Sequence, residues 1–156
     1  MKLYLAGPLF TTPERDWNAA LAARLEAAGH EVFLPQAHPA EPTGPAIFAK
    51  DLGGLDWAEG VVAIMDGPDP DSGTSWECGY AYATKKPVVL FRGDFRRSGD
   101  AGEIPYNAML VGAADVHIEL PLAPLDEAAD AIIAALAALP SRAAMPAPAD
   151  LAGTGG

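Results

Sequence analysis

The sequence predicts an α/β fold in which one parallel sheet is covered by helices on both faces. Two continuous apolar runs, at residues 60–65 and 87–91, are typical of strands that are buried on both sides. Segments with helical spacing alternate with the short apolar runs along the chain, and this order is typical of βαβ units. The length of 156 residues fits a single domain with a sizeable core.

The expected elements follow one another in a regular order. Strands are expected at residues 2–6, 31–34, 60–65, 87–91 and 116–120. Helices are expected at residues 13–28, 46–52, 73–84 and 125–139, with a short helical or irregular piece at 107–114. Five strands in this order suit a flavodoxin-like doubly wound domain over residues 1–139. Ligands of such sheets bind beyond the carboxyl ends of the strands, so the informative loops follow residues 6, 34, 65 and 91.

Local signals predict where the first two helices begin and end. Thr12 is expected to cap the first helix, with Pro13 in the first helical position and Gly29 at the end. Gly53 and Gly54 are expected to weaken the second helix beyond residue 52, because glycine is unfavourable in helix interiors.

Composition and charge exclude several classes of function. A net charge of −11 should repel a phosphate backbone, so no nucleic-acid polymer is expected as a partner, although a local arginine could hold a nucleoside monophosphate. No stretch approaches the ~18–20 apolar residues that span a bilayer. The apolar run at residues 1–10 is too short for a signal peptide, so a cytoplasmic protein with no membrane partner is expected. Ala, Pro and Gly dominate residues 140–156, which are expected to be a disordered tail.

Cysteine and histidine provide a negligible metal signal. Cys78 is the only cysteine, so an intrachain disulfide and a cysteine-based zinc cluster are both excluded. His30, His38 and His117 are scattered along the chain, and a structural role is expected for the first and the last of them. No metal and no cofactor are therefore expected.

Acidic side chains gather in the loops at the carboxyl edge of the predicted sheet. Asp66, Asp69 and Asp71 follow the third strand, Asp51 precedes it, and Glu77 is expected in the first turn of the next helix. The neighbours of Glu77 are small or apolar, and a carboxylate buried among them must be paired or held for a function. Enzymes that cleave glycosidic bonds need one carboxylate at the anomeric carbon and a second group for the leaving-group proton. This edge can supply both groups.

Each candidate residue also has an ordinary interpretation when it is taken alone. The acids are then solvated loop residues and a helix-start acid favoured by the helix dipole. Tyr4 is then a core residue of the first strand, Gln36 a polar loop residue and Asn107 a helix N-cap.

Three segments carry a recognisable pattern. The first segment is Leu3-Tyr4-Leu5-Ala6-Gly7-Pro8 at the N-terminus. The second and more specific one is Asp71-Ser72-Gly73-Thr74-Ser75-Trp76-Glu77-Cys78-Gly79-Tyr80-Ala81, which fits the pattern Asp-x-Gly-Thr-x-x-Glu-x-Gly-x-Ala. The third is Pro105-Tyr106-Asn107-Ala108-Met109-Leu110, which fits an Asn-x-Met pattern. In order and spacing, these segments resemble those of the nucleoside 2-deoxyribosyltransferases over residues 1 to about 120.

This resemblance implies catalytic roles for three residues. Glu77 matches the nucleophile that attacks C1′ and forms a deoxyribosyl-enzyme ester. Asp51 matches the acid that lies near the base and handles its proton. Tyr4 matches a tyrosine that orients the nucleophile. Covalent catalysis of this kind splits a difficult exchange into two easier displacements.

The resemblance also implies a substrate-binding set. Asp71 matches an acid that binds sugar hydroxyls, and Gly7 and Gly73 belong to the motifs at the same site. Asn107 matches a residue that binds the 5′-hydroxyl and is lent by a neighbouring subunit, with Met109 beside it. Gln36 corresponds to a base-contacting glutamine. The implied partners are a 2′-deoxynucleoside, a free purine or pyrimidine base, and at least one further copy of the chain.

Two other interpretations stay open at this point. A deoxynucleoside 5′-monophosphate N-glycosidase would share the fold and the nucleophile; Asn107 favours the nucleoside, whereas Arg92, Arg96 and Arg97 favour the nucleotide. A non-catalytic nucleotide- or flavin-binding domain of the same fold would show no turnover. The base preference, the balance between transfer and hydrolysis, and the number of subunits are not indicated by the sequence.

Overall fold

The computed structural model describes residues 1–39, 41–100 and 104–139. Its strands are β1 (Lys2–Ala6), β2 (Glu31–Phe33), β3 (Gly60–Ile64), β4 (Val88–Arg92) and β5 (Val116–Glu119). Its helices are α1 (Thr12–Ala27), a 3₁₀ turn (Pro35–Ala37), α2 (Gly44–Trp57), α3 (Ser72–Ala83), α4 (Ala108–Ala113) and α5 (Leu125–Ala138). The tail expected at residues 140–156 lies outside the described residues.

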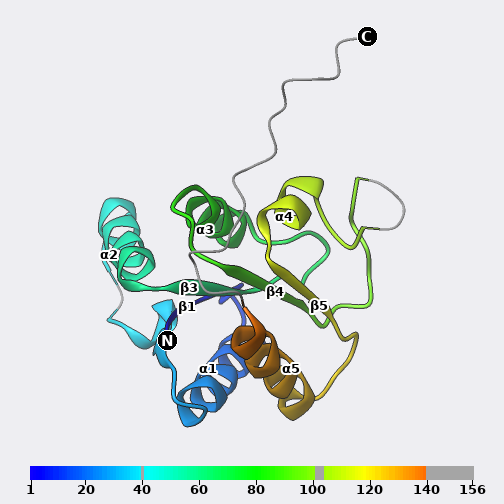
Figure 1. The fold of residues 1–156 in the computed structure, drawn as a ribbon. Helices are drawn as coiled ribbons and strands as arrows, with labels where there is room; N and C mark the ends of the chain where they lie inside the picture. The colour runs from blue at the N-terminus through cyan, green and yellow to red at the C-terminus, as the bar shows by residue number, and fades with distance from the viewer. Residues whose placement is uncertain (40, 101–103, 140–156) are drawn as a thin grey trace.

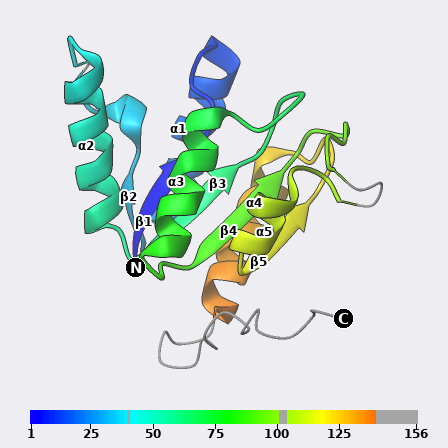
Figure 2. The same cartoon turned by 90° about the horizontal axis from the view of Figure 1, so that it is seen from above.

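The five strands form one all-parallel sheet in the order β2-β1-β3-β4-β5, which confirms the flavodoxin-like fold. Helices α1 and α5 cover one face, and α2, α3 and α4 cover the other (Figure 1). Seen from the side of α2, α3 and α4, all strands point the same way, and the loops after β3 and β4 gather beyond their tips (Figure 2). The strand order reverses between β1 and β3, where ligand sites of such sheets form.

Strand alternation divides the core into two layers. Leu3, Leu5 and their neighbours pack towards α1 and α5. Tyr4 and Ala6 point the other way and pack with Cys78 of α3. Because successive strand side chains point to opposite faces, Tyr4 is directed towards the helices that include α3. The two strands predicted from continuous apolar runs, β3 and β4, lie at the centre of the sheet and are buried along their whole length.

The structure corrects three details of the predicted helix ends. Thr11, and not Thr12, caps α1: its hydroxyl accepts from the backbone N–H of Glu14, whose carboxylate accepts from the N–H of Thr11 at 2.8 Å. Helix α2 continues through Gly53 and Gly54 to Trp57. A Cβ at Gly54 would lie 2.5 Å from the ring of Phe33. Close packing against β2 therefore requires glycine there and outweighs the helix propensity.

The third correction concerns α3. This helix begins at Ser72, with Asp71 as its N-cap, so Glu77 lies in the second turn and not in the first. The helix dipole acts mainly within the first turn, so it contributes little to the state of the Glu77 carboxyl group.

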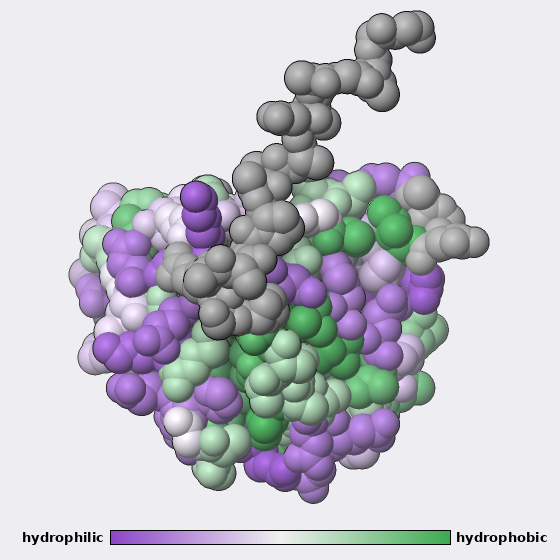
Figure 3. All heavy atoms as spheres, in the orientation of Figure 1, coloured by the Kyte–Doolittle hydropathy of each residue, from purple (hydrophilic) through white to green (hydrophobic). Residues whose placement is uncertain are grey.

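The opposite end of the molecule, where the strands begin, has a mixed surface. Figure 3 shows that hydrophilic side chains predominate on its left side, over α2, with hydrophobic side chains nearer its centre. In the parts of the chain that the structure describes, no helix combines the length and the apolar character needed to cross a membrane.

Candidate active site

Glu77 and Tyr4 meet at the carboxyl side of the sheet. Tyr4 is fully buried in β1, and its hydroxyl donates to Oε1 of Glu77 at 2.5 Å. The other carboxylate oxygen of Glu77 is not part of this bond. A tyrosine fixed by the core thus holds one oxygen of a half-buried glutamate.

The surroundings of Glu77 make its ionisation unusually difficult. The pKa of Glu77 is raised to about 7, chiefly by burial; the hydrogen bond from Tyr4 opposes the rise, and the charges of Asp51 and Asp71 contribute to it. Burial and the adjacent Glu77 charge raise the pKa of the Tyr4 hydroxyl, so Tyr4 stays protonated and keeps its donor. Glu77 can therefore exist in both protonation states near neutral pH.

Asp51 of α2 belongs to the same acidic cluster. Its Oδ1 is buried and has no hydrogen-bond partner among the described residues, and the Lys50 ammonium lies 3.7 Å from it. Burial raises the pKa of Asp51, and the charges of Lys50 and His38 partly oppose the rise. A carboxyl group with a raised pKa and an unsatisfied oxygen is suited to holding and releasing a proton.

Asp71 is held rigidly at the start of α3. Its Oδ2 accepts from the backbone N–H of Thr74 at 2.9 Å and from the Thr74 hydroxyl at 3.3 Å. A Cβ at Gly73 would lie 3.0 Å from this oxygen, so glycine gives the carboxylate room to cap the helix. Close packing also favours glycine at Gly7, just after β1, because a Cβ there would lie 3.1 Å from Cβ of Ile64.

An aromatic stack that the sequence did not reveal supports Tyr4. The Phe33 ring lies 5.4 Å from the Tyr4 ring, almost parallel to it, and the His38 ring stacks on Phe33 at 4.3 Å. In the sheet Tyr4 is paired with Phe33. The register of the β1–β2 pair would have revealed the contact, but a single sequence does not specify that register.

Gln36 does not join the cluster. Its amide nitrogen donates to the carbonyl of Arg15 in α1 at 2.6 Å, and its Oε1 is buried without a partner among the described residues. The histidine two positions later, His38, is the residue of this loop whose charge acts on Asp51.

Asn107 and Met109 line a groove whose lining does not include Glu77. Asn107 caps α4, and its Oδ1 accepts from the N–H of Met109 at 2.9 Å. Met109 is 81% exposed. Both residues line an open groove of about 760 Å³ between α3 and α4, and the acids Glu77, Asp51 and Asp71 are not part of its lining.

The three arginines after β4 are engaged in contacts of their own. The guanidinium of Arg92 is buried and donates to backbone carbonyls, including that of Gly67 at 3.0 Å. Arg96 forms an ion pair with Asp94, which lowers the pKa of that carboxyl group, and Arg97 binds Glu119 at 2.9 Å. In the portion of the chain that the structure describes, no group of three or more His, Cys, Asp or Glu residues has an arrangement that could hold a metal ion.

Residues 3–109 match the sequence profile described as nucleoside 2-deoxyribosyltransferase. The chain belongs to this family. The matched region contains Tyr4, Asp51, Asp71 and Glu77, so the whole acidic cluster lies inside it. A comparison with curated protein sequences returned no match.

The chain aligns with nearly the whole length of several solved structures. A 2-deoxyribosyltransferase from Bacillus psychrosaccharolyticus is 28% identical, with a TM-score of 0.64 over 85% of this chain and 96% of that one. A 2-deoxyribosyltransferase from Leishmania mexicana is 21% identical, with a TM-score of 0.66 over 85% and 97% of the two chains. A CMP N-glycosidase from Clostridium botulinum is 19% identical, with a TM-score of 0.61 over 85% and 98%. The last two likenesses show the fold alone.

Proposed function

We propose that this protein exchanges the base of a 2′-deoxynucleoside through a covalent deoxyribosyl ester on Glu77. The observation that carries the proposal is the 2.5 Å hydrogen bond from buried Tyr4 to Glu77, beside Asp51 and Asp71. It orients one carboxylate oxygen and leaves the other for attack, which is the arrangement that a nucleophilic carboxylate needs.

The first half-reaction breaks the N-glycosidic bond. The unbonded oxygen of ionised Glu77 attacks C1′, and the electron pair of the bond passes to the base nitrogen. Protonated Asp51, whose pKa is raised by burial, supplies the proton that the departing base takes up. In the second half-reaction an acceptor base attacks C1′, returns its proton to Asp51 and releases Glu77.

Asp71 binds hydroxyl groups of the sugar in this proposal, with Gly7 and Gly73 at the same edge. Asn107 and Met109 act on the site of a neighbouring subunit, so the active protein is at least a dimer. Support comes from the α3–α4 groove, which Asn107 and Met109 line and Glu77 does not, and from the 81% exposure of Met109. Gln36 keeps its proposed base contact only if its bond to Arg15 is broken on binding.

A nucleoside is favoured over a nucleoside 5′-monophosphate. A phosphate brought to this edge would meet the acidic cluster, and burial of its charge there is costly unless basic groups pair with it. The arginines that favoured the nucleotide have carbonyl or carboxylate partners: Arg92 in the interior, Arg96 with Asp94, and Arg97 with Glu119.

The direct test is base exchange. Purified protein is incubated with deoxyinosine and free adenine, and the products are followed by chromatography beside the Glu77→Gln variant, which is nearly the same size but cannot form the ester. Deoxyadenosine formed by the wild type and not by the variant is the expected result.

Other outcomes select the rival functions. Hypoxanthine released without deoxyadenosine would replace the transferase by a hydrolase, and the assay would be repeated with the 5′-monophosphate. Turnover of the monophosphate alone would identify the nucleotide N-glycosidase. No turnover of either substrate would favour the non-catalytic binding domain.

A further inference from the structure

Arg92, the last residue of β4, is a fully buried arginine. Among the described residues, no carboxylate forms an ion pair with it. It is 1% exposed. In the strand, Val88 and Leu90 point towards α3 and α4, and alternation directs Arg92 to the same side. Burying a guanidinium is costly unless its N–H groups are satisfied, so the position of this side chain needs a reason.

The reason lies in the carbonyl groups that it joins. Its Nη1 donates to the carbonyl of Met65, which follows β3, and its Nη2 donates to the carbonyl of Gly67 at 3.0 Å. Nε and Nη2 also donate to the carbonyl of Arg96, at 3.1 and 2.8 Å, in the loop after β4. One planar, rigid group therefore ties two loops together at the catalytic edge.

Gly67 transmits this constraint towards Asp71. Gly67 has a φ of +117°, which few other residues adopt, and its N–H donates to Asp94 while its carbonyl accepts from Arg92. Pro68 and Pro70 occupy two of the three positions between Gly67 and Asp71, and each fixes one backbone dihedral. The chain has little freedom between the anchored Gly67 and the carboxylate that caps α3.

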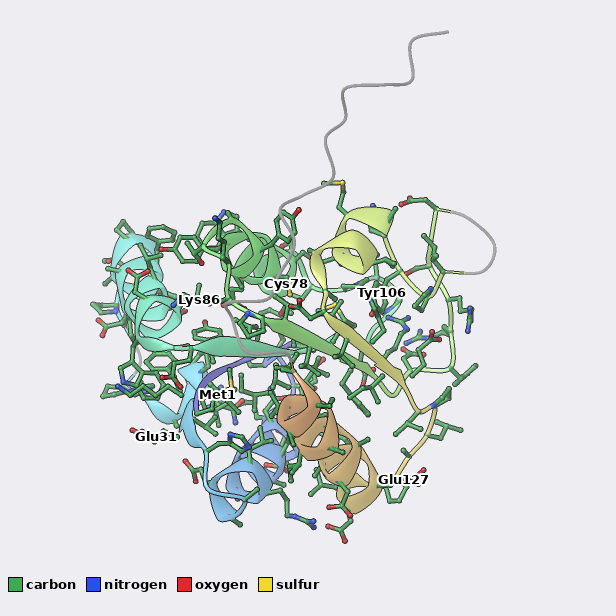
Figure 4. All side chains as sticks on the ribbon, in the orientation of Figure 1. Met1, Glu31, Cys78, Lys86, Tyr106 and Glu127 are labelled. Carbon is green, nitrogen blue, oxygen red and sulfur yellow. The ribbon has the colours of Figure 1, made fainter. Side chains whose placement is uncertain are left out.

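The other side of the guanidinium reaches the turn before Asn107. Arg92 lies over the Tyr106 ring, 5.9 Å from its centre, and Figure 4 shows Tyr106 on the α3–α4 side of the sheet, as Cys78 is. The Tyr106 hydroxyl is 2.8 Å from Nδ1 of His117, and Nε2 of His117 is 2.9 Å from the carbonyl of Val111 in α4. Because a carbonyl only accepts, Nε2 of His117 carries a proton, and in the neutral ring Tyr106 therefore donates to Nδ1.

We propose that Arg92 is a positioning residue that holds the Asp71 loop, which serves the site of its own chain, and the Asn107 turn, which serves the site of a neighbouring subunit, in a fixed relation, so that each can bind the sugar in its site. The sugar-binding purpose of this arrangement rests on the proposed function, whereas the contacts of Arg92 with the two segments do not. Arg92 works through Asp71 on one side and through Tyr106 and Asn107 on the other, and it does not contact the reacting atoms.

The test is a double-mutant cycle. Arg92→Lys keeps the charge and loses the fork that reaches three carbonyls. We expect kcat/KM for the deoxynucleoside to fall about 10- to 100-fold, as misplaced binding groups typically cause. In an Asp71→Asn background the same change should cost a clearly smaller factor than in the wild type, because one of the two groups that Arg92 positions is already impaired. The control Arg97→Gln, an exposed arginine of the same loop, should stay within about twofold of the wild type.

Tyr106→Phe provides a second, gentler variant, since it removes only the hydroxyl that donates to His117. It should lower kcat/KM in the wild type but not in an Asn107→Ala background. A purely structural role would instead lower activity by the same factor in every background, through the folded fraction, and equal factors in both cycles would overturn the proposal.

A readout that needs no turnover separates this inference from the proposed function. Amide hydrogen exchange of Arg92→Lys should accelerate in residues 66–74 and 107–111 together, while α1 and α5 exchange as in the wild type. Unchanged exchange in either segment would overturn the positioning role even if the wild type exchanges bases. If the wild type exchanges no bases but Arg92→Lys still accelerates amide exchange in both segments, the positioning role is supported and the transferase function is rejected.

Discussion

At the scale of the residue, Tyr4 controls how readily Glu77 ionises. Its hydrogen bond stabilises the carboxylate, so Tyr4→Phe should raise the pKa of Glu77 above about 7 while keeping the ring contact with Phe33. The nucleophile must be ionised, so the acid limb of the pH profile of kcat/KM should move up by about one unit. The loss at pH 6 would then exceed the loss at pH 8.5 by about tenfold. Tyr80→Phe, which removes a 2.5 Å bond to Asp56 on the surface, is the matched control and should leave the profile unchanged.

The same carboxyl group should destabilise the folded protein. The pKa of Glu77 is raised from 4.5 to about 7 on folding, so the folded state binds the proton more tightly than the unfolded state. The resulting penalty is absent below pH 4.5, grows as the pH rises, and is complete above about 7. Glu77→Gln should therefore be more stable than the wild type by up to about 3 kcal/mol at pH 8, and by little at pH 4.5.

Urea unfolding at the two pH values measures this difference. Glu26→Gln, an exposed position of α1, is the control and should show no comparable pH-dependent gain. A Glu77→Gln protein that is less stable than the wild type at pH 8 would show that the charge is compensated by contacts other than those described here.

At the scale of the element, the two adjacent glycines of α2 should respond in opposite directions. A Cβ at Gly53 meets nothing within 4 Å, so Gly53→Ala should stabilise the helix by about 0.5–1 kcal/mol. A Cβ at Gly54 meets the Phe33 ring at 2.5 Å, so Gly54→Ala should destabilise the protein by about 1–3 kcal/mol. Thermal unfolding of the two variants compares them directly. Equal and small shifts would mean that Phe33 is free to move away from α2.

These elements also show how far the sequence alone reaches. Apolar runs at residues 60–65 and 87–91 predicted the central strands β3 and β4, because burial on both faces leaves a clear pattern. Gly53-Gly54 misled the prediction of α2, since the need for glycine comes from a strand distant in sequence. Glu77 and Tyr4 were found through motifs, whereas the Phe33–His38 stack depends on strand register. Arg92 was misjudged, because burial of a charged residue at a strand end is not visible in sequence.

At the scale of the whole molecule, the proposed sharing of Asn107 with a neighbouring subunit predicts complementation between subunits. Glu77→Gln and Asn107→Ala should each be strongly impaired alone. In a dimer that carries one copy of each, one site combines an intact Glu77 with an intact Asn107 from the neighbour. Unfolding and refolding an equal mixture should recover about a quarter of the wild-type sites.

The matched control mixes Glu77→Gln with Tyr4→Phe. These two residues belong to the same site of the same chain, so their mixed dimers keep only the activity of the Tyr4→Phe sites. No recovery with the Asn107→Ala mixture, or a monomeric mass in solution for the active wild type, would contradict a shared site.

The covalent ester on Glu77 is the central claim, and intact-protein mass spectrometry tests it most directly. The protein is mixed with a deoxynucleoside in the absence of an acceptor base, quenched in acid and weighed, and the modified peptide is then sequenced. The account predicts a mass increase of one deoxyribosyl group, located within Ser72–Ala83 on Glu77, and none in Glu77→Gln. An adduct on another residue, or exchange by the wild type with Glu77 unmodified throughout, would contradict it.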